Sequence, residues 1–358
     1  MIEIPLESEK LDPIYDISKS YIENANNGPF FKCPTILKTL RPSKLIDFLG
    51  YKIQSPIGVP SGPLLNSKFI ELASKLGFDV LTYKTIRSNE HPGHPVPNMI
   101  FVETDDSHVA MKLETPPKDL SDLTLTNSFG MPSRSNEYLL EDIEKANKCL
   151  SDNQVMIVSI VGSQTNKHSL SQDFVNCAML AKEAGAKIIE ANFSCPNVKD
   201  KSSILYLDPQ SVYEIAVKIT KAIGPLPLII KLGKFPSRDL MEKVMIQAAY
   251  AGVQGLCGIN SISKKVMDGN SLALGELRPT SGICGASIRK EAISFIQEVI
   301  SINTQNKLNL KLLGCGGMMT QDHFDEILSL GCDIAMSATA MMWDPYLALR
   351  WKKKNGYL

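Results

Sequence analysis

The chain has 358 residues, of which 44% are hydrophobic, and its 38 Lys and Arg residues are balanced by 38 Asp and Glu residues. That length can bury one large core, and a formal net charge of zero argues against the basic surface of a nucleic-acid binder. The acidic segment 1–12 lacks the apolar stretch of a secretory signal, and no apolar run reaches the roughly 20 residues that span a bilayer, so we expect a soluble, cytoplasmic protein without a membrane partner.

Short β-branched segments alternate with longer amphipathic segments, which is the pattern of β–α units around a parallel sheet. In chain order, strands are predicted at residues 56–60, 80–84, 156–161, 188–193, 228–232, 256–260, 311–313 and 333–337. Helices are predicted at residues 67–76, 172–184, 208–223, 238–251, 288–302 and 320–330. Four of these helices are followed by a glycine that can close the helix in a left-handed conformation, namely Gly77, Gly185, Gly252 and Gly331.

Eight such units favour the closed (β/α)₈ TIM barrel of the α/β class over an open dinucleotide-binding sheet. A Rossmann fold would carry GxGxxG after its first strand, and residues 61–65 are S-G-P-L-L instead. We therefore divide the chain into an N-terminal extension (1–50), with short helices and a hairpin, and a barrel domain (51–350). A long insertion (87–148) follows the second strand and leaves from the face on which barrel enzymes carry their active sites.

The eight cysteines are scattered, and no two of them form a CxxC pair. Zinc-ribbon and iron–sulfur frameworks therefore have no support, and we expect no bound metal. In a long chain of this kind, scattered cysteines are typical of reduced and mostly buried thiols. The basic cluster Lys352–Lys354 is expected to be a solvated helix end.

The polar residues that follow the predicted strands are mostly amides and lysines, without a histidine or a carboxylate. They are Lys84, Thr85, Asn192, Cys195, Asn197, Lys231, Asn260 and Ser261, with Asn127 in the insertion. Amides offer paired donors and acceptors to a small planar molecule with carbonyl and ring N–H groups. The lysines suit anionic groups such as a carboxylate or a reduced flavin.

The last two units predict a phosphate site. Residues 314–318 (G-C-G-G-M) follow the seventh strand, and residues 337–340 (S-A-T-A) follow the eighth. Loops at these two places, with free backbone N–H groups and a helix start, form the usual phosphate site of a barrel. Residues 280–285 supply another glycine pair through which the backbone can approach the same ligand.

These motifs resemble those of a known family. Residues 192–197 (N-F-S-C-P-N) resemble the NxSCPN signature of class 1 dihydroorotate dehydrogenases, the soluble enzymes with a cysteine base, and residues 127–131 (N-S-F-G-M) are similar to their NSxG substrate loop. The resemblance covers roughly residues 53–345. In this chain Ala338 and Cys284 stand where the family usually has glycine, and Ser133 stands where asparagine is common. Neither glycine replacement removes a backbone donor, so FMN binding is still expected.

The resemblance implies FMN-dependent oxidation of dihydroorotate to orotate in pyrimidine biosynthesis, with Cys195 as the base that removes a proton and FMN as the hydride acceptor. It implies substrate contacts from Lys84, Asn127, Phe129, Gly130, Met131, Asn192, Asn197, Asn260 and Ser261. It implies cofactor contacts from Ser61, Gly62, Lys84, Thr85, Asn192, Lys231, Ser261, Gly282, Gly285, Gly316, Gly317, Ala338 and Thr339. Lys231 matches the lysine beside the pyrimidine edge of the flavin.

Two alternatives stay open on these residues. One is a related FMN barrel oxidoreductase that acts on another pyrimidine or enamide ring, and the other is a catalytically silent flavin-binding scaffold. The expected partners are the small-molecule substrate and a soluble electron acceptor, for which fumarate is the first candidate. We also expect a homodimer and no nucleic-acid partner.

Overall fold

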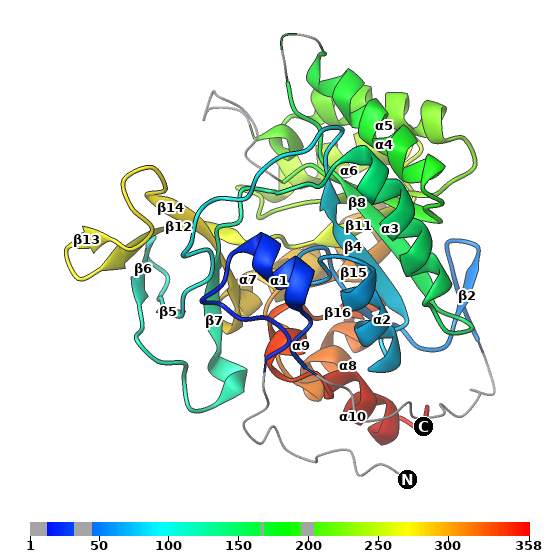
Figure 1. Cartoon of the computed structure of the whole chain (residues 1–358). Coiled ribbons are helices and arrows are strands. Elements are labelled where there is room, and N and C mark those ends of the chain that lie inside the picture. The colour runs from blue at the N-terminus through cyan, green and yellow to red at the C-terminus, as the bar shows by residue number, and fades with distance from the viewer. Residues whose placement is uncertain (1–12, 32–44, 165, 167, 195–203) are drawn as a thin grey trace.

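The structure is a computed structural model that describes residues 13–31, 45–164, 166, 168–194 and 204–358. Eight parallel strands close into a barrel, as Figure 1 shows. In spatial order they are β3 (Ile57–Val59), β4 (Val80–Ile86), β8 (Val155–Ile160), β9 (Ile188–Asn192), β10 (Leu228–Lys231), β11 (Gly255–Gly258), β15 (Lys311–Gly314) and β16 (Ile334–Met336). The predicted TIM barrel is confirmed, and each predicted strand overlaps one of these eight.

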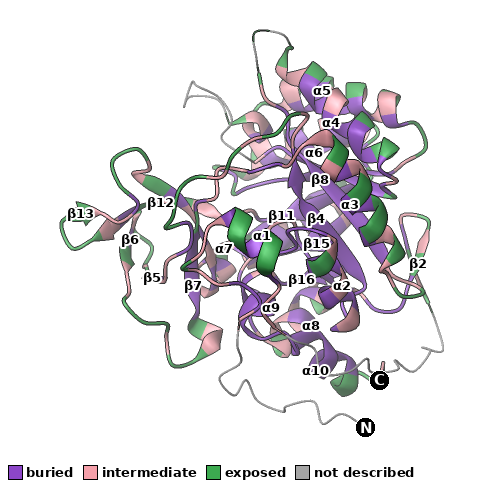
Figure 2. Ribbon diagram, viewed as in Figure 1, coloured by how far each residue is buried: buried purple, intermediate pink, exposed green. Residues whose placement is uncertain are grey.

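Helices cover the outside of the barrel, with exposed outer faces and buried inner faces (Figure 2). They are α2 (Ser67–Lys75), α3 (Asn136–Lys148), α4 (Leu170–Glu183), α5 (Pro209–Ile223), α6 (Arg238–Tyr250), α7 (Arg289–Gln305), α8 (Gln321–Leu330) and α10 (Leu347–Lys354). The six predicted helices are confirmed. Their starts have a local cause, since a side chain such as Asp208 before α5 accepts a backbone N–H of the first turn and Pro209 occupies the first helical position.

Helix α3 was not predicted, because it lies within the segment that we assigned to the insertion. It packs between α2 and α4 and so takes the place of the second barrel helix. Its buried residues Leu139, Asp142, Ile143 and Ala146 follow helical spacing, and Ser135 caps its start. The part of the insertion outside the barrel architecture therefore ends at about residue 135. The division at residue 50 stays a prediction.

The barrel interior is apolar at one end and polar at the other. Ile157, Ile188, Ile229 and Leu313 belong to one buried cluster, which the hairpin of β1 (Ile46–Phe48) and β2 (Tyr51–Ile53) closes from below. Residues two apart on a strand share a face. The inward face of β9 therefore carries Glu190 and Asn192 above Ile188, and that of β10 carries Lys231 above Ile229.

A second sheet stands beside the polar end of the barrel (Figure 1). Its strands, in spatial order, are β5 (Val102–Glu103), β6 (Val109–Lys112), β12 (Ile262–Asp268), β14 (Thr280–Gly285) and β7 (Thr124–Asn127), with β13 (Ser271–Leu272) paired to β12. Strands β5, β6 and β7 belong to the insertion after β4, and strands β12, β13 and β14 belong to the segment between β11 and α7, so the sheet joins these two segments. Asn127 pairs in register with Gly282, so the two predicted ligand loops are held together by backbone hydrogen bonds.

The N-terminal segment reaches the same end of the barrel. Helix α1 (Tyr21–Asn27) begins with a capping box between Ser20 and Glu23. Before it, the backbone N–H of Ile14 donates to the carbonyl of Met342 at 2.9 Å. The Tyr15 ring packs edge-on against Phe129 with the ring centroids 5.7 Å apart. The short helices α9 (Thr339–Trp343), η1 (Leu120–Asp122), η2 (Leu205–Leu207) and η3 (Ala286–Ile288) complete the described elements.

The expectation of a solvated helix end at Lys352–Lys354 is wrong for its first residue. Lys352 is fully buried, and its ammonium pairs with the buried carboxylate of Asp79 at 2.7 Å. Lys354 is exposed and pairs with Asp322 and Asp325. The amphipathic helix α10 turns Lys352 toward the barrel, so the ion pair ties the last helix to the start of β4. In the described ranges, no helix has the length and apolar character that crossing a membrane requires.

Candidate active site

A cavity opens at the carboxyl ends of the barrel strands. Its wall combines the loops after β3, β11, β15 and β16 with the second sheet and the N-terminal segment. The predicted residues that line it are Ser61, Gly62, Asn127, Phe129, Lys231, Asn260, Ser261, Gly285, Gly316, Gly317, Ala338 and Thr339.

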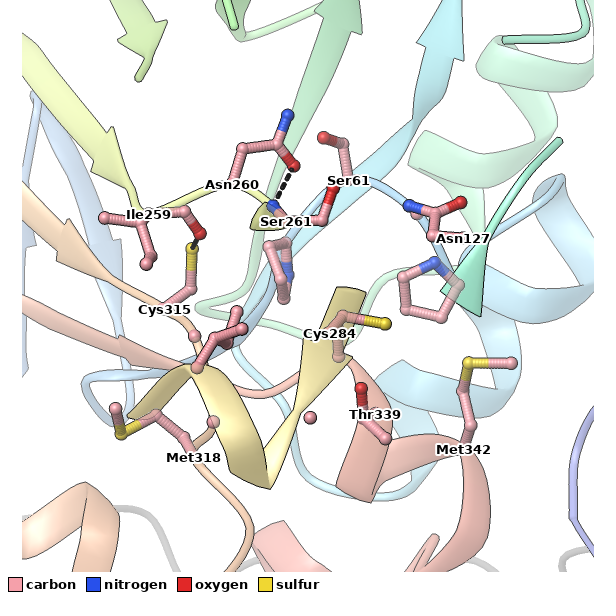
Figure 3. Close-up of a pocket in the computed structure, with 18 of the residues that line it drawn as sticks. Ser61, Asn127, Ile259, Asn260, Ser261, Cys284, Cys315, Met318, Thr339 and Met342 are labelled. Atoms are coloured by element: carbon pink, nitrogen blue, oxygen red, sulfur yellow. Dashed lines mark hydrogen bonds between the residues drawn. The ribbon is translucent and has the colours of Figure 1, made fainter. Parts of the chain in front are cut away.

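Polar groups gather at one end of the cavity. Figure 3 shows Ser61, Asn260, Ser261 and Asn127 there, and Met318, Thr339 and Met342 at the opposite end. The Asn260 side-chain oxygen accepts the N–H of Ser261 at 3.0 Å. This hydrogen bond fixes the orientation of the Asn260 side-chain amide at the cavity wall.

The Asn260 amide also joins two strands through Ser194. Its nitrogen donates to the Ser194 hydroxyl, which donates to the Asn192 side-chain oxygen at 2.8 Å. The Ser194 backbone N–H donates to the same oxygen at 3.2 Å. Asn192 is buried at the end of β9, and its side-chain oxygen accepts both of these hydrogen bonds from Ser194. The predicted base Cys195 follows Ser194 directly, but Cys195 and Asn197 lie outside the described residues.

Lys231 at the end of β10 is buried and lines the cavity. Its ammonium donates to the Ser61 hydroxyl at 3.2 Å. Burial alone would lower the pKa of Lys231, but the charge of Glu190 acts against burial, and the net pKa is raised. The lysine is therefore a fixed cation at neutral pH.

The other predicted residues lie close by without lining the cavity. Lys84 and Thr85 are buried near the end of β4, and the Thr85 hydroxyl lies 3.0 Å from that of Ser159. Gly130 and Met131 continue the Asn127 loop in left-handed conformations, with φ of 74° and 55°. The Met131 carbonyl accepts a hydrogen bond from Arg87 at 2.9 Å. Gly282 is placed in β14, where a Cβ would lie 2.2 Å from the Ser261 hydroxyl.

The backbone loops at the far end form a cradle. Gly317 has a φ of 71°, and a Cβ there would lie 2.5 Å from the Cβ of Arg289, so only glycine fits. The backbone of residues 315–319 and 338–339 lines the cavity, and no side chain caps the start of α9 at Ala338. Such backbone donors suit a phosphate group. At Gly62 a Cβ would meet nothing within 4 Å, which leaves open space for a ligand.

The donor set fits FMN. Backbone amides for a phosphate lie at one end, a cation and amides for a flavin's pyrimidine edge lie at the other, and apolar side chains such as Ile259 and Ile288 also line the cavity. Among the described residues, no group of three His, Cys, Asp or Glu side chains forms a metal site.

Sequence reasoning missed two kinds of residue at this site. One is a carboxylate, since Glu190 lies buried beneath Ser61, whereas we expected no carboxylate here. The sequence carries a signal for this carboxylate, because Glu190 is a charged residue in the middle of the buried strand Ile188–Asn192. The other comprises the cavity-wall residues Tyr15 and Met99, which come from segments distant from the recognised motifs and carry no local signal.

Comparison with known proteins agrees with this geometry. The family model described as dihydroorotate dehydrogenase matches residues 45–350. A dihydroorotate dehydrogenase of Dictyostelium discoideum is 46% identical over an alignment 360 residues long, and the alignment covers 96% of this chain and 97% of that protein. The catalytic subunit of dihydroorotate dehydrogenase B (NAD(+)) of Listeria welshimeri is 30% identical over 49% of this chain and 55% of its own length. The corresponding Enterococcus faecalis subunit is 26% identical over 62% and 67%.

Proposed function

The chain belongs to the dihydroorotate dehydrogenase family and is an enzyme that oxidises dihydroorotate to orotate in pyrimidine biosynthesis, and we propose that it does so with FMN in the cavity and Cys195 as the base. Members of this family are flavoenzymes. The match over nearly the full length of the Dictyostelium protein favours this substrate over another ring, and it argues against a silent scaffold.

The observation that carries the FMN assignment is that Lys231 and the glycine pair Gly316 and Gly317 line the same cavity. The cradle would hold the phosphate, and Lys231 would face the pyrimidine edge of the ring. FMN, when bound, supplies the hydride acceptor. The fixed positive charge of Lys231 would stabilise negative charge on that edge, as an oxyanion hole stabilises an anion.

The substrate would be held by amides. Asn127, Asn192, Asn197 and Asn260 would pair with its carbonyl and ring N–H groups, and Lys84 would face its carboxylate. Cys195 would then take the proton from C5, and a base must lie within hydrogen-bond distance to do so. Support comes from the Asn192–Ser194–Asn260 network, which fixes the chain immediately before Cys195.

The purified protein is expected to be yellow and to release FMN on denaturation. Absorbance of the native protein, followed by chromatography of the released cofactor, measures the stoichiometry, for which we expect about one FMN per chain. A colourless protein that takes up no added FMN would refute the assignment of the cavity. Release of FAD in place of FMN would also refute it.

We expect fumarate to reoxidise the reduced enzyme without a second protein. Fumarate resembles the carboxylate-bearing edge of orotate, so the same lysine and amides can bind it after orotate leaves. Anaerobic turnover with dihydroorotate and fumarate measures this directly. Turnover that requires NAD⁺ and an additional flavoprotein, in keeping with the NAD(+) in the names of the bacterial relatives, would contradict it. We also propose that the protein forms a homodimer, that it is cytoplasmic, and that its barrel domain begins after residue 50.

A further inference from the structure

A buried carboxylate lies directly beneath the cavity. Glu190 on the inner face of β9 is fully buried, and one of its oxygens accepts a hydrogen bond from the Ser61 hydroxyl at 3.0 Å. Its second oxygen has no hydrogen-bond partner among the described residues. A buried carboxylate is unfavourable unless a positive charge compensates it. Its retention inside an otherwise apolar strand therefore calls for a cation nearby.

Lys231 is that cation. Strands β9 and β10 are neighbours, and Lys231 pairs in register with Asn192, two residues beyond Glu190. The ammonium donates to the Ser61 hydroxyl at 3.2 Å and to the Ser61 carbonyl at 3.5 Å, while the same hydroxyl donates to Glu190. The Ser61 hydroxyl thus bridges the two charges, since it accepts from the Lys231 ammonium and donates to the Glu190 carboxylate.

The other titratable groups that face Lys231 are thiols. Cys257 lies on β11, the neighbour of β10, and Cys315 follows β15, the next strand of the barrel, and both thiols are buried. The hydrogen bond with Cys315, together with burial, raises the pKa of Cys257, whereas the hydrogen bond with Cys257 and the charge of Lys231 lower the pKa of Cys315, whose sulfur lies 3.8 Å from that of Cys257. Glu190 is the group that a hydrogen-bond chain through the Ser61 hydroxyl links to the Lys231 ammonium.

We propose that Glu190 is a positioning residue which, through Ser61, fixes the Lys231 ammonium at the cavity wall and offsets its charge, and so sets the reduction potential of the flavin bound there. This inference rests on the proposed FMN function. With Glu190 present, the negative charge of reduced flavin faces a compensated lysine. Without it, the flavin faces a bare cation that would hold the reduced form more tightly and oppose its reoxidation.

The variant Glu190→Gln keeps the size of the side chain and an acceptor oxygen for the Ser61 hydroxyl but removes its charge. At pH 6, where Lys231 is protonated, we expect its affinity for reduced over oxidised FMN to rise on the order of tenfold, since one charge acts at close range in a weakly polar interior. For a two-electron couple, this is a potential about 30 mV more positive. Glu190→Asp keeps the charge and is expected to stay near the wild-type potential.

The potentials are measured by equilibration with a reference dye, using FMN-loaded protein. A wild-type potential in FMN-loaded Glu190→Gln would overturn the inference, whereas wild-type protein that binds no FMN would refute the proposed function instead. If Glu190→Gln does not fold, Ser61→Ala provides the test. That variant removes the hydroxyl that links Glu190 to Lys231, so the compensation of the lysine is weakened and the potential at pH 6 again rises. An unchanged potential in Ser61→Ala would overturn the inference as well.

Discussion

Replacement of Cys195 by alanine is expected to slow flavin reduction by dihydroorotate on the order of 10²–10⁴-fold, the usual contribution of a general base. Orotate binding and FMN content should be retained, because the amides, Lys84 and Lys231 are unchanged. An unperturbed thiol has a pKa of about 8.5. The wild-type rate should therefore rise with pH until the thiolate predominates. Stopped-flow absorbance of the bound flavin measures these rates.

Two further variants serve as comparisons for Cys195→Ala. Cys195→Ser should keep residual activity that grows at high pH, because a hydroxyl accepts a proton less readily than a thiolate. Cys149→Ala, at the end of α3 and away from the cavity, should reduce at the wild-type rate. Near-wild-type reduction in Cys195→Ala would mean that the thiol is structural and that the base lies elsewhere.

Replacement of Lys352 by methionine is expected to lower the free energy of unfolding by about 3–5 kcal/mol, because it leaves the carboxylate of Asp79 buried without its cation. Lys352 and Asp79 are both fully buried. Burial raises the pKa of Asp79 even though Lys352 acts in the opposite direction, so the carboxylate depends on this partner. Urea denaturation followed by circular dichroism gives the free energy.

Lys353→Met is the matched control, since the adjacent side chain is exposed. Its effect should stay within about 0.5 kcal/mol. The double variant Lys352→Met/Asp79→Asn should recover part of the loss, because the unpaired charge is then gone. Equal stabilities of Lys352→Met and Lys353→Met would show that the buried pair contributes nothing to stability.

The barrel could be predicted from the sequence because its signals are local. Each β–α unit carries its own apolar strand, amphipathic helix and closing glycine, such as Gly331 after α8 in its left-handed conformation. Helix α3 also carried a local signal, with its cap at Ser135 and helical spacing of its buried residues. It was missed because the polar insertion was treated as one loop.

The second sheet could not be predicted in the same way. Strands β7 and β14 are separated by about 150 residues in the sequence. Neither short segment contains a feature that specifies its partner strand or the register of the pairing. The position of Tyr15 against Phe129 likewise depends on how the N-terminal segment packs on the finished barrel. The inward position of Glu190 follows from strand alternation once Ile188 is assigned to the interior, but its compensation by Lys231 depends on three-dimensional packing.

Anaerobic titration of the FMN-loaded enzyme with dihydroorotate tests the central claim most directly. The account predicts that the flavin absorbance bleaches on addition of about one equivalent of dihydroorotate and that one orotate is released per flavin reduced. Unchanged flavin absorbance in the presence of excess dihydroorotate, with FMN still bound, would contradict the assignment of this cavity as the site of dihydroorotate oxidation.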